Sequence, residues 1–334
     1  MVLRPREFAT TTRQPGDIDV RVLVTGGAGF IGANLVRMLT EDDRFGRVAV
    51  IDDLSTGYRD NLDGLDIELH VGSILDHDLL DQAVAGADAI VHLAAIPSVP
   101  RSVADPVASH HANATGTLMV LEAARRHGGP HVIVASSSSV YGANPSLPKH
   151  EDLRTQPLSP YAVGKQATES YALAYGHCYE LPTLAFRFFN VFGPLQAAGH
   201  AYAAAIPTWI DAALTGAAIP INGDGKQTRD FTYVGSVAGV IVEALLRRSV
   251  SDDPVNLAFG TRRTLLDTVA SIGAALDVEL TCQHGPDRPG DVPHSQADGS
   301  RLAAMVPGFE PVDFEVGLAE TVAWFRTLPA YSRA

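Results

Sequence analysis

The chain of 334 residues contains little cysteine and no long hydrophobic run. Its two cysteines, Cys178 and Cys282, are too few for a disulfide framework or a thiolate zinc site. No segment reaches the roughly twenty apolar residues that a membrane-spanning helix needs, and the N-terminus lacks the apolar core of a secretion signal. We therefore expect a cytoplasmic protein with no membrane partner.

Positive charge is also scarce. The sequence has 25 Lys and Arg residues against 38 Asp and Glu residues, a formal net charge of −13, and its basic residues form no block. Nucleic acid is a poor partner for such a chain. An anionic substrate must therefore be held by cations at particular positions.

The histidines lack the further ligands that a metal site needs. His110 and His111 are adjacent, and His127 and His131 are four residues apart. His131 already falls in a strand pattern, and no cysteine or acidic residue completes a tetrahedral set. We therefore predict no metal site.

What the sequence does contain is a glycine-rich segment, Gly26-Gly-Ala-Gly-Phe-Ile-Gly32, directly after an apolar strand pattern. Gly26 permits a tight turn, Gly29 lets the backbone approach phosphates, and Gly32 allows the following helix to pack closely on the strand. The free N–H groups at the start of that helix then face the anion. This order of strand, turn and helix predicts a binding site for the pyrophosphate of a dinucleotide.

An acidic residue stands where such a site needs one. The second apolar strand pattern ends in Asp52 and Asp53, and Asp52 lies 20 positions beyond Gly32. A carboxylate there can accept hydrogen bonds from both hydroxyls of the adenosine ribose, and it would repel a 2′-phosphate. The pattern therefore favours NAD over NADP as the cofactor.

Strand-like and helix-length segments alternate through the first half of the chain. Such alternation predicts an α/β fold with a Rossmann-type, doubly wound parallel sheet. The predicted strands are Val22–Thr25, Val48–Ile51, Ile67–Val71, Ala89–Leu93, His131–Ala135 and Thr183–Phe188, and the helix-length segments between them include Gly32–Thr40 and Asn113–His127.

The organisation of the whole chain follows from where this pattern begins and loosens. Residues 1–19 show no periodicity and are expected to form a flexible leader. We expect an NAD-binding domain over residues 20–189, because the alternation runs through that range. Glycine and proline then cluster in loops, which predicts a smaller, mainly substrate-binding lobe over 190–334. Parts near 230–260 are expected to return to the first domain.

A second group of residues indicates acid–base chemistry. Ser159 and Pro160 are typical of a helix start, so Tyr161 and Lys165 stand one turn apart on one helix face. The lysine ammonium favours the phenolate, which lowers the pKa of Tyr161 and allows it to act as a base near neutral pH. The serine run 136–139 places hydroxyls at the carboxyl end of an apolar strand, where ligands bind in open α/β sheets.

With these motifs in place, the chain from Arg21 to about Trp324 resembles the extended short-chain dehydrogenase/reductase family. Within it, the chain is similar to the nucleotide-sugar 4-epimerases of the UDP-glucose and UDP-N-acetylglucosamine type. The resemblance implies that Tyr161 is the catalytic base, that Lys165 holds the nicotinamide ribose and tunes Tyr161, and that Ser137 hydrogen-bonds the reacting sugar hydroxyl.

The resemblance also implies a set of NAD-binding residues. At one position the chain departs from many relatives: Gly72 is followed by Ser73 instead of an aspartate, so a contact to the adenine must come from Ser73 or from the backbone. The implied cofactor set is Gly26, Gly29, Phe30, Ile31, Gly32, Asp52, Asp53, Ser55, Thr56, Gly57, Ser73, Ile74, Leu93, Ala94, Ala95, Asn113, Ser136, Tyr161, Lys165, Phe188 and Val191.

Motifs in the second half resemble the family's substrate side. Asn190 matches a residue that contacts the substrate diphosphate, and Arg229, Arg288 and Asp291 match diphosphate- and ribose-binding residues. Two guanidinium groups suit the phosphates of a substrate in an otherwise acidic protein. The implied substrate set is Ser98, Arg101, Ser137, Ser138, Ser139, Tyr161, Asn190, Tyr202, Arg229, Arg288 and Asp291.

The expected reaction is an NAD-dependent 4-epimerisation of a UDP-hexose or UDP-N-acetylhexosamine, through a 4-keto sugar. A 4,6-dehydratase or a UDP-glucuronate epimerase or decarboxylase of the same family is the alternative. Relatives that dehydrate or decarboxylate tend to carry an acid near the catalytic hydroxyl, and Ser138 and Ser139 supply none. A non-catalytic NAD sensor would not need Ser137, Tyr161 and Lys165 together.

Two segments bear on the sugar and one pair of helices on assembly. Residues 98–102 and 199–202 resemble bacterial epimerases that accept N-acetylated hexosamines, and residues 195–198 lack the arginine that uronic-acid epimerases often place there. We therefore expect room for a C2 acetamido group.

In the family, helices equivalent to 113–127 and 161–179 pair across a two-fold axis, which implies a homodimer with a four-helix interface.

Overall fold

The fold is built around one parallel sheet. The computed structural model describes residues 20–198, 204–286 and 294–331. The predicted leader at 1–19 and the predicted site residues Tyr202, Arg288 and Asp291 lie outside these ranges. Seven strands form the sheet in the order β11-β6-β5-β4-β1-β2-β3, all parallel: β1 Arg21–Thr25, β2 Arg47–Asp52, β3 Glu68–Val71, β4 Ala89–His92, β5 His131–Ser137, β6 Thr183–Phe188 and β11 Val255–Leu257.

The order of the strands confirms the predicted doubly wound α/β fold. The chain runs outward from β1 through β2 to β3, and then returns past β1 to β4, β5 and β6. The change of direction between β1 and β4 is the topological switch point of such a sheet, where its ligands bind. The central strands are apolar and buried along nearly their whole length, because helices cover both faces.

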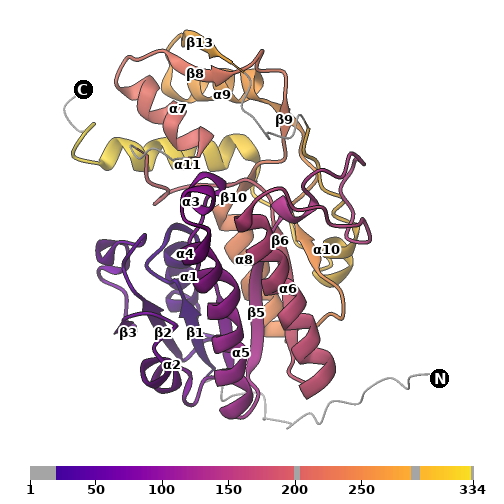
Figure 1. The fold of residues 1–334 in the computed structure, drawn as a ribbon. Coiled ribbons are helices and arrows are strands. Elements are labelled where there is room, and N and C mark those ends of the chain that lie inside the picture. Colours follow the sequence, from indigo (N-terminus) through magenta and orange to yellow (C-terminus); the bar gives the residue numbers. More distant parts are fainter. Residues whose placement is uncertain (1–19, 199–203, 287–293, 332–334) are drawn as a thin grey trace.

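Two groups of helices sandwich the sheet (Figure 1). On one face, α1 (Phe30–Thr40) and α8 (Val234–Arg247) pack on each other and on the strands through aliphatic side chains such as Leu35 and Ile241. On the other face, α2 (His77–Val84), α5 (Gly116–Arg126) and α6 (Pro160–Tyr179) enclose a second core that includes Leu121.

One predicted helix begins earlier than expected. The segment predicted as Asn113–His127 is preceded by a short helix α3 (Val99–Ala104) and starts at Pro106 with α4 (Pro106–His110). It continues through a π-helical turn at His111–Thr115 into α5. The reason is an aspartate cap: the Asp105 side chain accepts a hydrogen bond from Ala108 N at 2.9 Å, and proline occupies the first helical position.

The second lobe stands at the carboxyl edge of the sheet, above it in Figure 1. Its core gathers aromatic side chains, among them Phe192, Trp209 and Phe325. The elements there are β7 Val191–Phe192, α7 Ala205–Leu214, β8 Ile219–Asn222, β9 Thr228–Arg229, β10 Thr232–Tyr233, β12 Arg263–Thr264, α9 Leu265–Leu276, β13 Cys282–Gly285 and α11 Phe314–Thr327. The short helix α10 (Ser300–Met305) packs instead on β11, and its Leu302 joins the core of α1 and α8. Short 3₁₀ turns occur at Arg59–Leu62 and Ser138–Tyr141.

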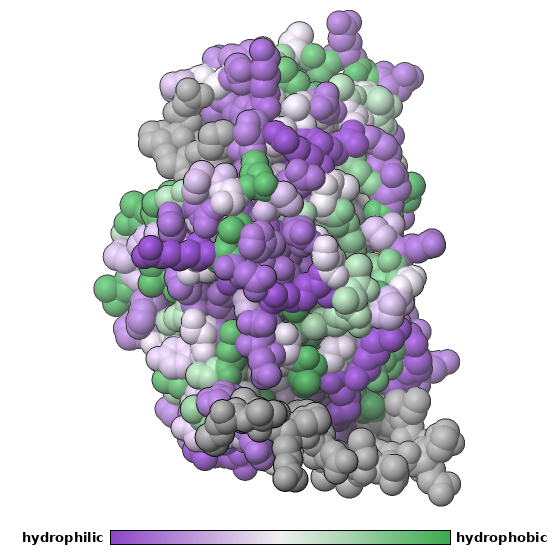
Figure 2. All heavy atoms as spheres, turned by 90° about the vertical axis from the view of Figure 1, so that its right-hand side faces the viewer, coloured by the Kyte–Doolittle hydropathy of each residue, from purple (hydrophilic) through white to green (hydrophobic). Residues whose placement is uncertain are grey.

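The surface carries both hydrophobic and hydrophilic residues. Figure 2 shows the right-hand side of Figure 1, where hydrophobic residues lie singly or in small groups among hydrophilic ones on the coloured part of that face. Such scattered apolar residues are normal on a protein surface. Within the described ranges, none of the helices has the length and hydropathy needed to span a membrane. Cys178 is exposed and Cys282 half-buried, and both are free thiols.

Candidate active site

A cavity of about 910 Å³ lies at the carboxyl edge of the sheet, between the strand ends and the second lobe. Its walls come from the turn after β1, the ends of β2, β4 and β5, the start of α6 and the segment after β6. This volume is at the upper end of the range for small-molecule and cofactor sites. The cavity therefore occupies the position that the strand order predicts for a ligand.

The glycine turn forms the floor of one end of this cavity. Gly26 has a φ of +72°, and a Cβ added to it would lie 2.6 Å from Ala94 N, so only glycine fits the turn. A Cβ on Gly32 would lie 2.2 Å from the Gly26 carbonyl oxygen, so the start of α1 can approach the turn only with glycine there. The N-cap of α1 is Gly29, which has no side chain to cover the free helix N–H groups. These groups can therefore bind a pyrophosphate.

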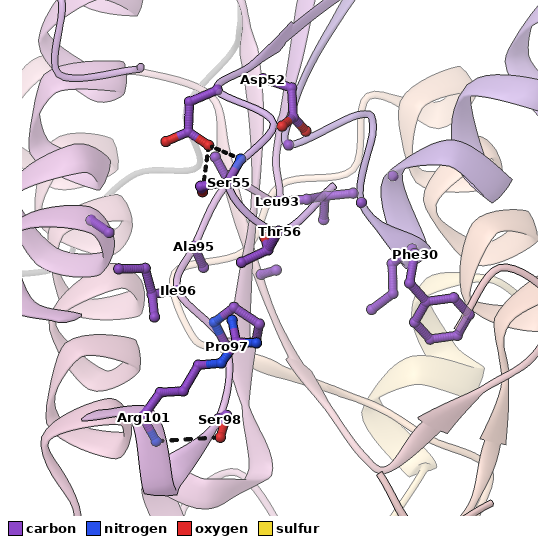
Figure 3. Close-up of a pocket in the computed structure, with 18 of the residues that line it drawn as sticks. Phe30, Asp52, Ser55, Thr56, Leu93, Ala95, Ile96, Pro97, Ser98 and Arg101 are labelled. Carbon is purple, nitrogen blue, oxygen red and sulfur yellow. Dashed lines mark hydrogen bonds between the residues drawn. The ribbon is translucent and has the colours of Figure 1, made fainter. Parts of the chain in front are cut away.

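Asp52 stands at the end of β2 beside this turn, and its side chain is labelled in Figure 3. It is buried, with Oδ2 accepting a hydrogen bond from Ala28 N at 2.9 Å and Oδ1 accepting one from Leu54 N at 2.8 Å. Burial raises the pKa of Asp52, although the backbone hydrogen bonds act against this. Each carboxylate oxygen has a second lone pair, so the group can still accept from ribose hydroxyls while it braces the glycine turn.

The segment after β4 forms another wall. Leu93, Ala95, Ile96, Pro97, Ser98 and Arg101 line the cavity here (Figure 3). The Ser98 side chain caps α3 by accepting a hydrogen bond from Arg101 N. Behind this wall, Asn113 is buried and its side chain pairs with the backbone of Ile96: Oδ1 accepts from the N–H at 2.8 Å and Nδ2 donates to the carbonyl at 3.2 Å. Asn113 therefore supports the cavity wall and does not line it.

The predicted catalytic residues meet at the carboxyl end of β5. Ser137 is the last residue of β5, and Tyr161 is in the first turn of α6, whose start is fixed by the Ser159 cap on Ala162 N. Ser137, Tyr161 and Lys165 all line the cavity. The Lys165 Nζ donates a hydrogen bond to the Ala135 carbonyl oxygen at 2.8 Å.

The electrostatics of this group differ from the expectation. Burial raises the pKa of Tyr161, and a hydrogen bond with the Ser137 side chain opposes that rise. Burial also lowers the pKa of Lys165 to about 8. The expected lowering of the tyrosine pKa by Lys165 is therefore wrong for this structure. Removal from water is the largest effect on both groups, because both are enclosed.

The cavity unites most of the residues implied by the sequence. Its lining includes Gly26, Gly29, Phe30, Ile31, Gly32, Asp52, Asp53, Ser55, Thr56, Ser73, Ile74, Leu93, Ala94, Ala95, Ser98, Arg101, Ser136, Ser137, Tyr161, Lys165, Phe188, Asn190 and Val191. Ser138 and Ser139 turn into the following 3₁₀ segment outside the lining, and Gly57 packs behind Ala28. Arg229 also lies outside the lining, with its Nη1 donating to the Thr228 carbonyl at 2.9 Å.

Sequence reasoning missed several lining residues. Tyr58 and Asn61 reach the cavity because both bind Ala28 of the glycine turn: Tyr58 N and Asn61 Nδ2 donate to its carbonyl at 3.1 and 2.9 Å. His111, weighed earlier only as a metal ligand, lines the cavity from the π-helical turn. The spacing of these residues carries no local signal, since the folded chain alone brings them together. No group of three His, Cys, Asp or Glu residues in the described ranges could hold a metal ion.

Comparison with known proteins gives a consistent result. Residues 22–258 match the model of the NAD dependent epimerase/dehydratase family. The chain is 37% identical to a UDP-glucose 4-epimerase of Mycolicibacterium smegmatis, over 92% of this chain and 99% of that protein. It is 33% identical to a dTDP-glucose 4,6-dehydratase of Streptomyces niveus, over 92% and 93%.

A solved structure extends the likeness to the fold. The structure of a UDP-N-acetylglucosamine 4-epimerase from Methanobrevibacter ruminantium M1, in complex with UDP-N-acetylmuramic acid, matches with a TM-score of 0.87 and 38% identity. The match covers 92% of this chain and 98% of that one. The similarity therefore spans both the sheet and the second lobe.

Proposed function

Because this chain belongs to the NAD dependent epimerase/dehydratase family and is an NAD-dependent enzyme that modifies nucleotide sugars, we propose that it is a 4-epimerase of a UDP-hexose or UDP-N-acetylhexosamine. One observation carries this choice. Ser137 and Tyr161 line the cavity, and the acidic residues among its described lining are Asp52 and Asp53, both at the far end of β2. A dehydration needs an acid beside the sugar, and among the described lining residues no such acid lies next to these two hydroxyls.

The proposed reaction has two halves. The glycine turn at 26–32 and Asp52 would hold NAD, which would supply the reversible hydride transfer at C4 of the sugar. Tyr161 takes the proton of the C4 hydroxyl as the hydride leaves, and Ser137 holds that hydroxyl by a hydrogen bond. The 4-keto sugar turns about its diphosphate, and Tyr161 returns the proton after hydride reaches the other face.

Lys165 has a role in both halves. Its ammonium lies on the helix face of Tyr161, one turn further on, and lines the same cavity. Since burial favours the neutral phenol, the developing phenolate needs a positive charge near it. Lys165 supplies this charge, and we propose that it also holds the nicotinamide ribose.

The substrate diphosphate requires cations in this acidic protein. We propose that Arg229 and Arg288 hold the two phosphates and that Asp291 binds the ribose of the nucleotide. Asn190 supports this arrangement, because it lines the cavity and its Nδ2 donates to the Asp230 carbonyl at 3.1 Å, next to Arg229. Ser98 and Arg101, which line the cavity, complete the proposed sugar side together with Tyr202, whereas Ser138 and Ser139 lie outside the lining and are not part of it.

The walls near the second lobe bear on the choice of sugar. Leu195, Gln196, Ala197 and Ala204 line the cavity after the Gly-Pro at 193–194, and none of them is a cation. A C6 carboxylate would find no charged partner among these described residues of the wall, which disfavours a glucuronate substrate. We therefore propose a neutral sugar, with room for an acetamido group at C2.

Product analysis tests the proposal. The purified protein is incubated separately with UDP-glucose, UDP-N-acetylglucosamine, UDP-glucuronate and dTDP-glucose, without added reductant, and the products are identified by nuclear magnetic resonance. The proposal predicts the C4 epimer of one or both neutral UDP-sugars. A 4-keto-6-deoxy sugar or a pentose as the main product would assign the alternative activity.

We also propose that two copies of the chain associate through the expected pair of helices, α5 and α6, together with α3 and α4, which pack against α6. Val103, Val107 and Val163 are 65, 63 and 53% exposed on α3, α4 and α6, which pack side by side. Three exposed valines on adjoining helices make an apolar surface that a second copy would cover.

A further inference from the structure

A buried ion pair lies directly behind the catalytic residues. Arg187 of β6 and Glu169 of α6 face each other with Nη2 to Oε1 at 2.7 Å and Nε to Oε2 at 3.0 Å. Their side chains are 4 and 5% exposed. Stability alone does not explain such a pair, since hydrophobic residues of similar volume often serve a fold as well or better. Its position relative to Lys165 suggests another role.

Glu169 follows Lys165 by four residues, so the two side chains emerge on the same face of α6. Opposite charges at this spacing attract each other, and burial strengthens the attraction. Yet the two residues form no ion pair: Lys165 Nζ donates to the Ala135 carbonyl oxygen at 2.8 Å, and burial alone accounts for its lowered pKa. The Glu169 carboxylate is occupied by Arg187 instead.

Ser136 connects this ion pair to the catalytic end of the sheet. Its Oγ lies 2.7 Å from Glu169 Oε2 and 3.2 Å from the carbonyl oxygen of Lys165. Ser136 and Arg187 are also neighbours in register across β5 and β6. The turn of α6 that carries Lys165 is therefore fixed to both strands, immediately before Ser137.

We propose that Arg187 is a positioning residue, which binds the Glu169 carboxylate so that the Lys165 ammonium stays directed into the cavity and is not drawn into a pair with Glu169. Arg187 suits this task, because it also donates through Nη1 to the Glu151 carbonyl at 3.3 Å and lies over the Tyr141 ring at 4.7 Å. These contacts fix the guanidinium against the Glu169 carboxylate. The kinetic part of the inference rests on the proposed epimerase reaction.

The kinetic test uses the variants Arg187→Met, Glu169→Gln and the double variant. In Arg187→Met the free carboxylate attracts Lys165, so we expect kcat to fall about 100-fold, as misplacement of a catalytic group does. Glu169→Gln removes the competing charge and should cost less than about tenfold. The double variant should recover about tenfold or more over Arg187→Met, because the two effects are not additive. A double variant no more active than Arg187→Met overturns the inference.

Glu151→Gln is the matched control. Glu151 is also a buried carboxylate, and its Oε1 accepts a hydrogen bond from Asn256 N at 2.8 Å, away from α6. This variant loses a buried charge without freeing a partner for Lys165, so kcat should stay within about threefold. If Arg187→Met does not fold, the variant Glu169→Gln tests the inference. A fall in kcat of more than about 100-fold, with NAD still bound, would show that Glu169 itself is required and would overturn the inference.

A structural measurement does not depend on the reaction. Crystal structures of Arg187→Met and of the double variant are compared at Lys165. We expect Nζ to move from the Ala135 carbonyl to within ion-pair distance of Glu169 in the single variant, and to remain on Ala135 in the double variant. Lys165 unmoved in Arg187→Met overturns the inference. If the native protein turned over no nucleotide sugar, the proposed function would fail while this comparison still decided the role of Arg187.

Discussion

Two effects act in opposite directions on the pKa of Tyr161: burial raises it, and the hydrogen bond with Ser137 lowers it. The Tyr161 hydroxyl is in contact with Ser137 at the cavity wall. The raised pKa keeps the phenol protonated in the free enzyme. A cation placed near the hydroxyl favours the phenolate and so allows the proton to leave. The sequence suggested the partner, Lys165, but could not reveal the burial, because burial is a property of the folded chain.

The variant Tyr161→Phe removes the hydroxyl and keeps the ring. We expect turnover to fall at least about 1,000-fold, since general acid–base catalysis contributes on the order of 10² to 10⁴-fold. NAD and the UDP-sugar should still bind, because the hydroxyl is needed only for proton transfer. Steady-state kinetics and calorimetry measure the two effects. Activity within tenfold of the native enzyme would remove Tyr161 from the reaction.

Asp52 braces the glycine turn, and we propose that it also binds the adenosine ribose. In Asp52→Ala, the N–H groups of Ala28 and Leu54 lose their acceptor, and the ribose loses a charged one. We expect NAD affinity to fall about 10- to 100-fold and the preference for NAD over NADP to shrink. The comparison is Asp53→Ala, whose carboxylate binds Ser55 on the exposed side. Equal NAD affinity in native and Asp52→Ala protein, measured by calorimetry, would contradict this role.

Among the elements, the buried strands were the most predictable. Parallel strands that are covered on both faces appear in the sequence as continuous apolar runs. The predicted bounds of Thr183–Phe188 equal the observed ones, and those of the other predicted strands differ by at most two residues. The start at Pro106 was missed, although Asp105-Pro106 is a helix-start signal. The short strands of the second lobe have two to four residues and pair across long loops, so no local pattern marks them.

The helices α3, α4 and α6 carry the prediction about assembly. A glutamate at Val163 would place charge in the proposed interface, so Val163→Glu should convert a dimer into a monomer. Val316, 52% exposed on α11, provides the matched control: Val316→Glu should leave the dimer intact. Light scattering coupled to gel filtration measures the mass. A native protein that is monomeric at micromolar concentration would contradict the proposal.

At the scale of the whole molecule, two buried histidines contribute to the loss of stability in acid. Burial lowers the pKa of His92 to about 3 and that of His131 to about 4, against 6.5 for an exposed histidine. His92 lies between the hydroxyls of Thr25 and Thr117, at 2.8 and 3.0 Å. The unfolded chain therefore binds more protons than the folded one between about pH 3 and 6.5, and stability must fall as the pH falls through that window.

The expected size is about 2 kcal/mol of unfolding free energy per histidine at pH 5, relative to pH 7.5. Asp230 has the opposite effect on stability. Burial raises its pKa to about 6, so the folded chain binds more protons than the unfolded one between about pH 6 and 3.8, and this group adds stability as the pH falls through that range. Denaturant unfolding at both pH values measures the balance. His131→Gln should reduce the pH dependence and the exposed His150→Gln should not; equal slopes in all three proteins would contradict the assignment.

The central claim is that hydride leaves C4 and returns to C4 of the same sugar. It is tested most directly with UDP-sugars carrying deuterium at C4, given to the purified enzyme without added NADH, with the position of the label followed by nuclear magnetic resonance. The account predicts deuterium retained at C4 in both the substrate and its C4 epimer. Deuterium found at C6 of a 4-keto-6-deoxy product, or lost to solvent during epimerisation, would contradict it.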